Sequence, residues 1–282
     1  MRVPESLLTY HSRPGGRWGR ILPGVYELTA LPPNRRRPLL AALLWAGEDA
    51  VLSHRTAAGI LRLDGVGAPT IELWARRVRV PTGLTVHRGR VGREDTATSG
   101  PLRHTSLLRT VIDLAGVLDE DTLELVVESA LRRDRHLEPA LAESGRKGAG
   151  ALKRVLGRRP TGCPPTDSEL ETRYLQLIRR ADVPAPIRQY PVHDEDGRTV
   201  GRLDLCWPEV GLWVELDGRI WHDRPQALLY DRHRQNDLAT RLQWLPLRFT
   251  WDDVMKRPGS TARLTELAYQ RRVQGRPNGL TS

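Results

Sequence analysis

The chain has 282 residues, a formal net charge of +10 and a sequence pI of about 10.3, so it can bury two hydrophobic cores and favours a polyanionic partner, with DNA first. Its two cysteines, Cys163 and Cys206, fit no ligand or disulfide pattern, which excludes a disulfide scaffold and indicates a reduced compartment. No apolar run approaches membrane-spanning length and no signal-peptide pattern opens the sequence, so we expect a cytoplasmic protein with no membrane partner.

Residues 1–157 are predicted to form an N-terminal α+β domain. A short strand region with a Pro-Gly turn comes first, followed by two helices, two strands and three helices. Apolar periodicity, a glycine stop and the candidate N-cap Ser53 support these assignments. In order, the expected elements cover residues 21–28, 35–47, 53–63, 70–76, 83–89, 105–118, 119–135 and 137–145.

Residues 158–167 are rich in Pro, Gly and Thr and are predicted to form a linker to a second domain, 168–275, with a tail at 276–282. The second domain should begin with a helix that Ser168 caps and end with a helix that Asp252 caps. The expected order of elements is helix 167–181, strands 187–194, 198–207 and 211–218, helix 226–242, strand 243–251 and a helix ending near 272. The predicted fold class is α/β (α+β), with a mixed sheet flanked by helices.

The stretch from Arg202 to His222, RLDLCWPEVGLWVELDGRIWH, places three carboxylates among apolar strand residues. If Pro208–Gly211 is a four-residue hairpin loop, Asp204 lies directly opposite Glu215, and Asp217 shares the face of Glu215. Like charges placed opposite each other destabilise a sheet, whereas a hard divalent cation such as Mg²⁺ prefers carboxylate oxygens. The spacing therefore predicts a metal site held by Asp204 and Glu215, for Mg²⁺ or Mn²⁺.

Glu171 projects onto the apolar stripe of the helix after the linker, so it is expected to face the sheet and join these acids. The competing interpretation is that Glu171 only completes a capping box with Ser168.

Further candidates follow the acidic strand. His222 could act as a general base or an additional ligand, and the neighbouring Trp221 either fills the core or stacks on a base or sugar. The charged helix and the next strand supply cations that would hold DNA phosphates: Arg224, Arg232 and Arg248. Charge runs of this kind are also common on solvated helix faces.

The segments GRLDLCWPEVGLWVELDGRIWH and YDRHRQNDLATRLQWLPLRFTWDDV resemble a bacterial endonuclease-like domain related to the very-short-patch-repair (Vsr) mismatch endonucleases, in the PD-(D/E)XK superfamily. The resemblance covers about Ser168 to Arg272. It implies a restriction-endonuclease-like mixed sheet and metal-dependent hydrolysis of a DNA phosphodiester by an activated water.

Residue by residue, the resemblance assigns Asp204 and Glu215 to the metal, Glu171 to the helix-borne acid and His222 to the proton chemistry. Asp217, the remaining catalytic candidate, falls where many members of the superfamily carry lysine, which is a departure from the pattern. Arg202, opposite Asp217 in the expected register, is predicted to supply the missing positive charge and to contact DNA.

The N-terminal segments RILPGVYEL, AVLSHRTAAGIL and TSLLRTVIDLAGVL resemble AbiEi-type antitoxins of abortive-infection systems, with only part of the winged helix present. That resemblance implies a toxin or other protein partner. Three hypotheses follow: a Mg²⁺-dependent endonuclease, a non-catalytic DNA-binding antitoxin or transcriptional regulator with a degenerate nuclease fold, and a purely structural set of salt bridges to Arg202 and Arg232.

Overall fold

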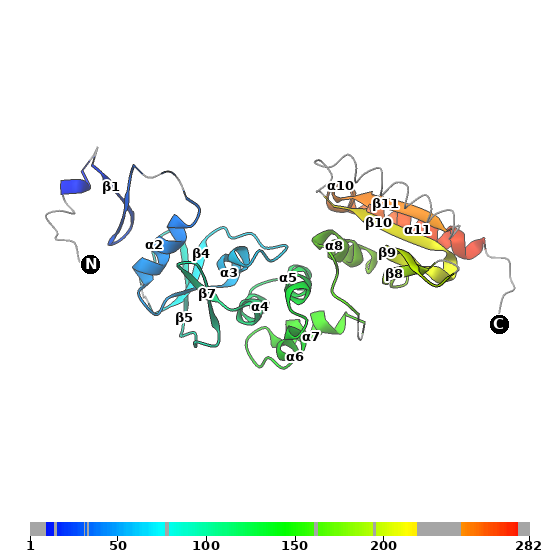
Figure 1. Cartoon of the computed structure of the whole chain (residues 1–282), viewed down its shortest axis with the longest axis horizontal. Helices are drawn as coiled ribbons and strands as arrows, with labels where there is room; N and C mark the ends of the chain where they lie inside the picture. The colour runs from blue at the N-terminus through cyan, green and yellow to red at the C-terminus, as the bar shows by residue number, and fades with distance from the viewer. Residues whose placement is uncertain are drawn as a thin grey trace. The chain divides into compact units, whose positions relative to one another are not determined.

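The structure is a computed structural model that describes residues 10–13, 16–30, 32, 34–76, 79–160, 163–193, 196–218 and 244–275 (Figure 1). It divides the chain into two units, Met1–Arg159 and Pro160–Ser282. Both units combine helices with β-sheet, and the two larger sheets contain parallel and antiparallel pairs, so the predicted α/β (α+β) class is confirmed. Across the described ranges, every helix is too short or too polar to cross a lipid bilayer.

The N-terminal unit contains a two-stranded ribbon and a five-stranded sheet. The strands of this unit are β1 (Trp18–Leu22), β2 (Val25–Leu28), β3 (Val51–Leu52), β4 (Ile71–Ala75), β5 (Leu84–Arg88), β6 (Thr96–Ser99) and β7 (Leu102–Thr105). β1 and β2 form the antiparallel ribbon, and the larger sheet has the order β5-β4-β3-β7-β6, in which β4 pairs with β5 and β3 with β7 in parallel.

Helices build the remainder of this unit and supply most of its core. Ser106 and Asp119 cap α4 and α5 through their side chains, as their residue types favour. The predicted apolar side of α5 is buried among the neighbouring helices. The helices are α2 (Arg37–Ala46), α3 (His54–Ile60), α4 (Leu107–Ala115), α5 (Glu120–Arg133), α6 (Leu137–Ala142) and α7 (Ala149–Gly157).

The two faces of the larger N-terminal sheet differ in character. Leu73 and Ala75 of β4 join an apolar core with Leu43 of α2, whereas Glu72 and Trp74 point to the opposite face because side chains alternate along a strand. On that face the backbone N–H of Glu72 donates to Thr56 Oγ1 of α3, and the Trp74 indole donates to Asp113 of α4. A polar layer therefore separates this face from α3 and α4.

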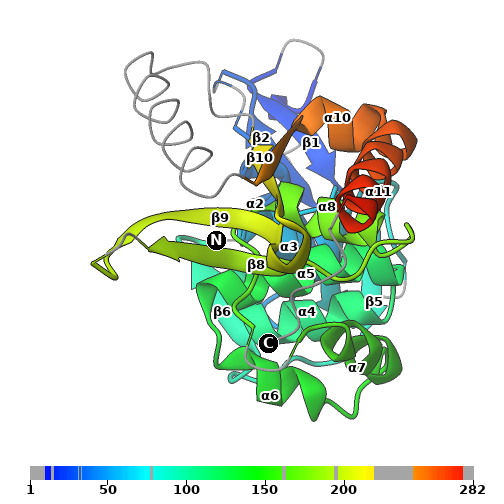
Figure 2. The ribbon, with the colours of Figure 1, turned by 90° about the vertical axis from the view of Figure 1, so that its right-hand side faces the viewer.

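The C-terminal unit is built around a four-stranded sheet of order β11-β10-β9-β8. β10 pairs with β11 in parallel and with β9 antiparallel, and β8 with β9 forms a long hairpin, visible in Figure 2. The elements are α8 (Glu169–Ile178), β8 (Ile187–His193), β9 (Thr199–Trp207), the 3₁₀ helix η1 (Pro208–Val210), β10 (Leu212–Asp217), β11 (Leu245–Thr250), α10 (Trp251–Lys256) and α11 (Pro258–Gln274).

Large side chains close the C-terminal core between the sheet and helices α8, α10 and α11. Trp207 and Tyr174 are fully buried, and each polar atom finds a partner: the Trp207 indole donates to Pro184 O at 2.8 Å, and the Tyr174 hydroxyl bonds Thr265 Oγ1 at 2.8 Å. Buried aromatic side chains of this kind contribute both apolar area and fixed geometry.

Four short elements were not predicted, namely β3, β6, β7 and α7. β3 has two residues, and β6 and β7 form a hairpin around Gly100 at φ 62 that lacks a strong apolar alternation. Asp252 was wrongly assigned as a helix cap. Thr250 caps α10 instead, in a reciprocal capping box with Asp253. The helix predicted at 226–242 lies outside the described residues.

Candidate functional site

The tight reversal between β9 and β10 fixes which residues face each other. Trp207 pairs with Leu212 and Leu205 with Val214, which confirms the predicted register. The turn closes through Gly211 at φ 63, a left-handed conformation that glycine adopts without steric cost. One step further along both strands, Asp204 and Glu215 are the next opposed residues and share one face.

The two carboxyl groups meet at the end of the paired segment. The Asp204 and Glu215 side chains interact closely enough for Glu215 to affect the pKa of Asp204. Asp204 Oδ2 accepts the backbone N–H of Leu216 at 3.0 Å. Burial raises the pKa of Asp204, and the negative charge of Asp167 raises it further. Two carboxyl groups this close repel each other when both are ionised, so a proton or a cation between them would stabilise the pair.

Glu171 is buried in the first turn of α8, with an exposure of 2%. Ser168 Oγ accepts the backbone N–H of Glu171, but the Glu171 carboxylate does not return to Ser168. Its Oε2 accepts the N–H of Asp167 at 2.8 Å instead. Burial raises the pKa of Glu171 to about 7, opposed by the Asp167 N–H and reinforced by the negative charge of Asp204. Glu171 therefore caps the helix, and its pKa also depends on the charge of the nearby Asp204.

Gln189 is a member of this site that the sequence did not reveal. It lies on β8 between the pairs Arg188–Leu205 and Tyr190–Leu203, and hence opposite Asp204, with a left-handed φ of 53. Its amide Nε2 donates to Glu171 Oε2 at 3.2 Å. A lone glutamine within a strand carries no recognisable sequence signal, because its placement depends on this local backbone distortion.

Asp217 pairs with Arg248 and not with Arg202, the residue that the hairpin register sets opposite it. Arg202 forms an ion pair with Asp167 at 2.7 Å, and its charge also lowers the pKa of Asp204. Its role as the positive charge of the site stays a prediction. Asp217 pairs with Arg248 of β11 at 2.9 Å. The parallel register sets Glu215 beside Arg248, which lets the long arginine side chain reach Asp217 two residues along.

Four predicted residues lie outside the described part of the chain. They are the histidine and tryptophan after β10, an arginine just before the expected charged helix and one within it: His222, Trp221, Arg224 and Arg232. Their assigned roles stay predictions.

The donor set suits a hard divalent cation, since Asp204, Glu215, Glu171 and Gln189 offer only oxygen ligands. Within the described ranges, the buried Oε1 atoms of Glu171 and Gln189 accept no hydrogen bond, and such buried oxygens are stabilised by coordination. The carboxylate oxygens of the three acids lie farther apart than the ligands of an occupied metal site. Among described residues, the one group of three His, Cys, Asp or Glu ligand atoms within 4.8 Å of one another lies in the N-terminal unit. A cation that bound all three acids would draw Glu171 towards the pair.

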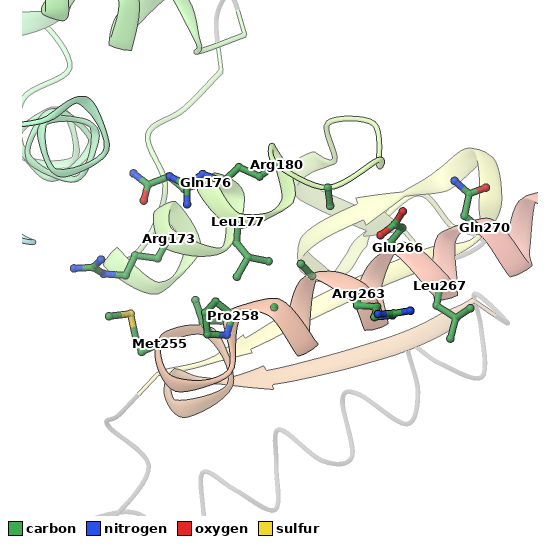
Figure 3. A pocket seen from close by; sticks show the side chains of 14 residues that line it. Arg173, Gln176, Leu177, Arg180, Met255, Pro258, Arg263, Glu266, Leu267 and Gln270 are labelled. Atoms are coloured by element: carbon green, nitrogen blue, oxygen red, sulfur yellow. The ribbon is translucent and has the colours of Figure 1, made fainter.

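A separate groove of about 870 Å³ runs between α8, α10 and α11 on the helical side of the C-terminal unit (Figure 3). Arg173 of α8, Arg180 just beyond the end of α8 and Arg263 of α11 border it, and Met255 and Leu267 contribute apolar surface. None of the acidic site residues lines this groove, so its size is no argument about the carboxylate chemistry.

Similar proteins occur in Mycobacterium tuberculosis. "Uncharacterized protein Rv2248" (strain ATCC 25618 / H37Rv) and "Uncharacterized protein MT2308" (strain CDC 1551 / Oshkosh) are each 31% identical to the chain over 250 residues, which covers 86% of this chain and 89% of the relative. A match of that length includes part of both units. No family model matches the chain.

Proposed function

The chain belongs to the family of the mycobacterial proteins Rv2248 and MT2308, whose names state no activity, and from its acidic site we propose that it is a metal-dependent DNA endonuclease. The supporting observation is that the strand register brings the Asp204 and Glu215 side chains together, close enough to interact. Glu215 is buried and Asp204 is half-buried, and two such acids held side by side in a sheet destabilise the fold unless a proton or a cation lies between them. The Vsr-like resemblance of the same residues supports phosphodiester hydrolysis as the chemistry.

Asp204 and Glu215 would hold Mg²⁺ or Mn²⁺, with Glu171 and Gln189 supplying further oxygens. Such an ion acidifies its bound water and offsets the charge that develops on a phosphate. Burial raises the pKa of Glu171 to about 7 in the metal-free protein, and a bound cation would favour its ionised form, which supplies a ligand oxygen from α8. The hydrogen bond from Gln189 keeps its carboxylate oriented towards the site.

Positive charge around the acids would hold the DNA backbone. Arg248 is positioned by Asp217 and remains 43% exposed, and Arg202 lies near Asp204 while pairing with exposed Asp167. Arginine binds phosphate through two parallel N–H donors, which fixes orientation as well as charge. Asp217 is thus a positioning residue for Arg248 in this proposal.

Nicking of supercoiled plasmid by the full chain tests the proposal, in Mg²⁺, in Mn²⁺ and in EDTA. Asp204→Asn should lower the rate by more than about 100-fold, since loss of even an outer-shell partner of a metal ligand typically costs about 10- to 100-fold. Glu169→Gln on α8 is the control, because it removes an acid of the same unit that pairs with Arg173. Equal cleavage by wild type and Asp204→Asn would refute the assignment.

A second candidate is a regulator that binds DNA without cutting it. The β1–β2 ribbon favours this function, because it forms a sheet of its own and carries exposed Arg17 and Arg20 in a protein of net charge +10. β-Ribbons with basic side chains are one established way to contact a DNA groove. DNA binding that is retained by every variant, with no cleavage in either metal, would favour the regulator.

A further inference from the structure

Two histidines and a glutamate meet in the N-terminal unit, independently of the acidic site. His54 opens α3, Glu72 lies on β4 and His87 on β5. The parallel pairing of β4 with β5 sets His87 beside Trp74, on the same sheet face as Glu72. Each of the three residues offers one ligand atom, and these atoms all lie within 4.8 Å of one another.

The contacts within this cluster hold the ligand atoms close together. Glu72 Oε2 bonds His87 Nε2 at 2.9 Å, while Arg55 takes the other oxygen, Oε1, at 3.3 Å. His54 Nδ1 bonds Ser53 Oγ at 2.9 Å, which presents Nε2 as the ligand atom of that ring. A side-chain hydrogen bond on one ring nitrogen is the usual way in which proteins orient the other nitrogen towards a metal.

The backbone at His54 is the second, independent observation. Its φ of 47 places a side chain with a Cβ in the left-handed region, which glycine adopts far more readily. The ring is nonetheless buried, with a residue exposure of 3%. Strained residues of this kind persist where the surroundings fix them and gather at functional sites. Filling space in a core requires neither the strain nor the imidazole.

We propose that His54, Glu72 and His87 form a binding site for a divalent transition-metal ion of the zinc class. Two imidazoles and one carboxylate are the protein ligands of zinc sites that keep a further position for water or a ligand. Nitrogen donors favour such ions over Mg²⁺, which separates this site chemically from the oxygen-only acidic site. His87 is 22% exposed on the edge strand β5, so an ion can enter from that side.

Binding requires one ring to turn. The His54 and His87 rings are stacked, with centroids 3.5 Å apart and planes 15° from parallel. A metal lies in the plane of each imidazole that binds it, and nearly parallel planes do not meet at bonding distance. His87 is the more exposed ring, so it rotates out of the stack and exchanges its hydrogen bond with Glu72 for a shared ion.

Titration of the untagged full chain with Co²⁺ and Cu²⁺ tests this site. The Asp204→Asn background weakens the acidic site, and the same titration of wild type in excess Mg²⁺ provides a second means of masking it. Nitrogen hyperfine structure in the Cu²⁺ spectrum distinguishes imidazole from carboxylate ligands. His87→Gln is the test variant, and His104→Gln is the matched control, since His104 is a buried histidine of the same sheet that bonds Ser99 instead.

We expect one nitrogen-ligated ion per chain in wild type and in His104→Gln. His87→Gln should bind more weakly by at least about 100-fold, because it loses a ligand and not merely a supporting partner. Absence of a nitrogen-ligated ion in the wild-type protein would overturn the proposal. Equal binding by His87→Gln and His104→Gln would also overturn it.

Discussion

Replacing Glu171 by glutamine should stabilise the metal-free C-terminal unit at alkaline pH. Glu171 is buried and its pKa rises from the ordinary 4.5 to about 7, chiefly through burial. A carboxyl group whose pKa is raised on folding stabilises the protein fully below pH 4.5, and that contribution is lost as the pH rises through 7. The difference between 4.5 and about 7 corresponds to about 3 kcal/mol of folding free energy at pH 8.

Glutamine removes the charge and keeps the geometry. Its carbonyl oxygen can still accept the N–H of Asp167, as Glu171 Oε2 does at 2.8 Å, and its amide can donate towards Asp204. The gain should therefore be present at pH 8 and absent at pH 4, where the wild-type carboxyl group is already protonated.

Calorimetric unfolding in EDTA between pH 4 and pH 8 measures this effect. At about 4 °C per kcal/mol for a unit of this size, the melting temperature of the C-terminal unit should rise by about 10 °C at pH 8. Glu169→Gln, which breaks an ion pair with Arg173 on the same helix, should change stability by less than about 0.5 kcal/mol. A pH-independent gain, or no gain at pH 8, would refute the argument that burial of the Glu171 charge is costly.

Three other outcomes are expected. Arg109→Met should destabilise the N-terminal unit by about 3–5 kcal/mol in denaturant titration, because buried Arg109 pairs with Asp95 at 2.6 Å and with Asp113 at 2.7 Å. A loss of stability below about 1 kcal/mol would contradict a strong contribution from this buried network. Trp207→Ala should cost about 3–5 kcal/mol in the C-terminal unit, and unchanged stability would mean that the core repacks around the missing ring. Arg248→Ala should lower the slope of log affinity for DNA against log salt by about 1, and an unchanged slope would remove Arg248 from the DNA contact.

The acidic pair was accessible from sequence because it depends on two local rules. A strand alternates its side chains, and the reversal at Pro208–Gly211 sets the register, so Asp204 and Glu215 had to be opposed once the hairpin formed. The helical period likewise directed Glu171 towards the interior.

Long-range pairing was decided only by the tertiary structure. The parallel alignment of β10 with β11 gave Asp217 its partner Arg248, which the hairpin register alone could not reveal. Gln189 reaches the site because its backbone adopts a left-handed φ, which no residue pattern in the sequence predicts.

The cluster of His54, Glu72 and His87 shows the same limit most clearly. Its members come from the start of a helix and from two strands that pair in parallel, with long connections between them. Sequence by itself determined the elements whose form follows from local periodicity, capping and turn length. Which distant elements then lie side by side depends on how whole surfaces pack, and that information is not contained in any short stretch of the chain.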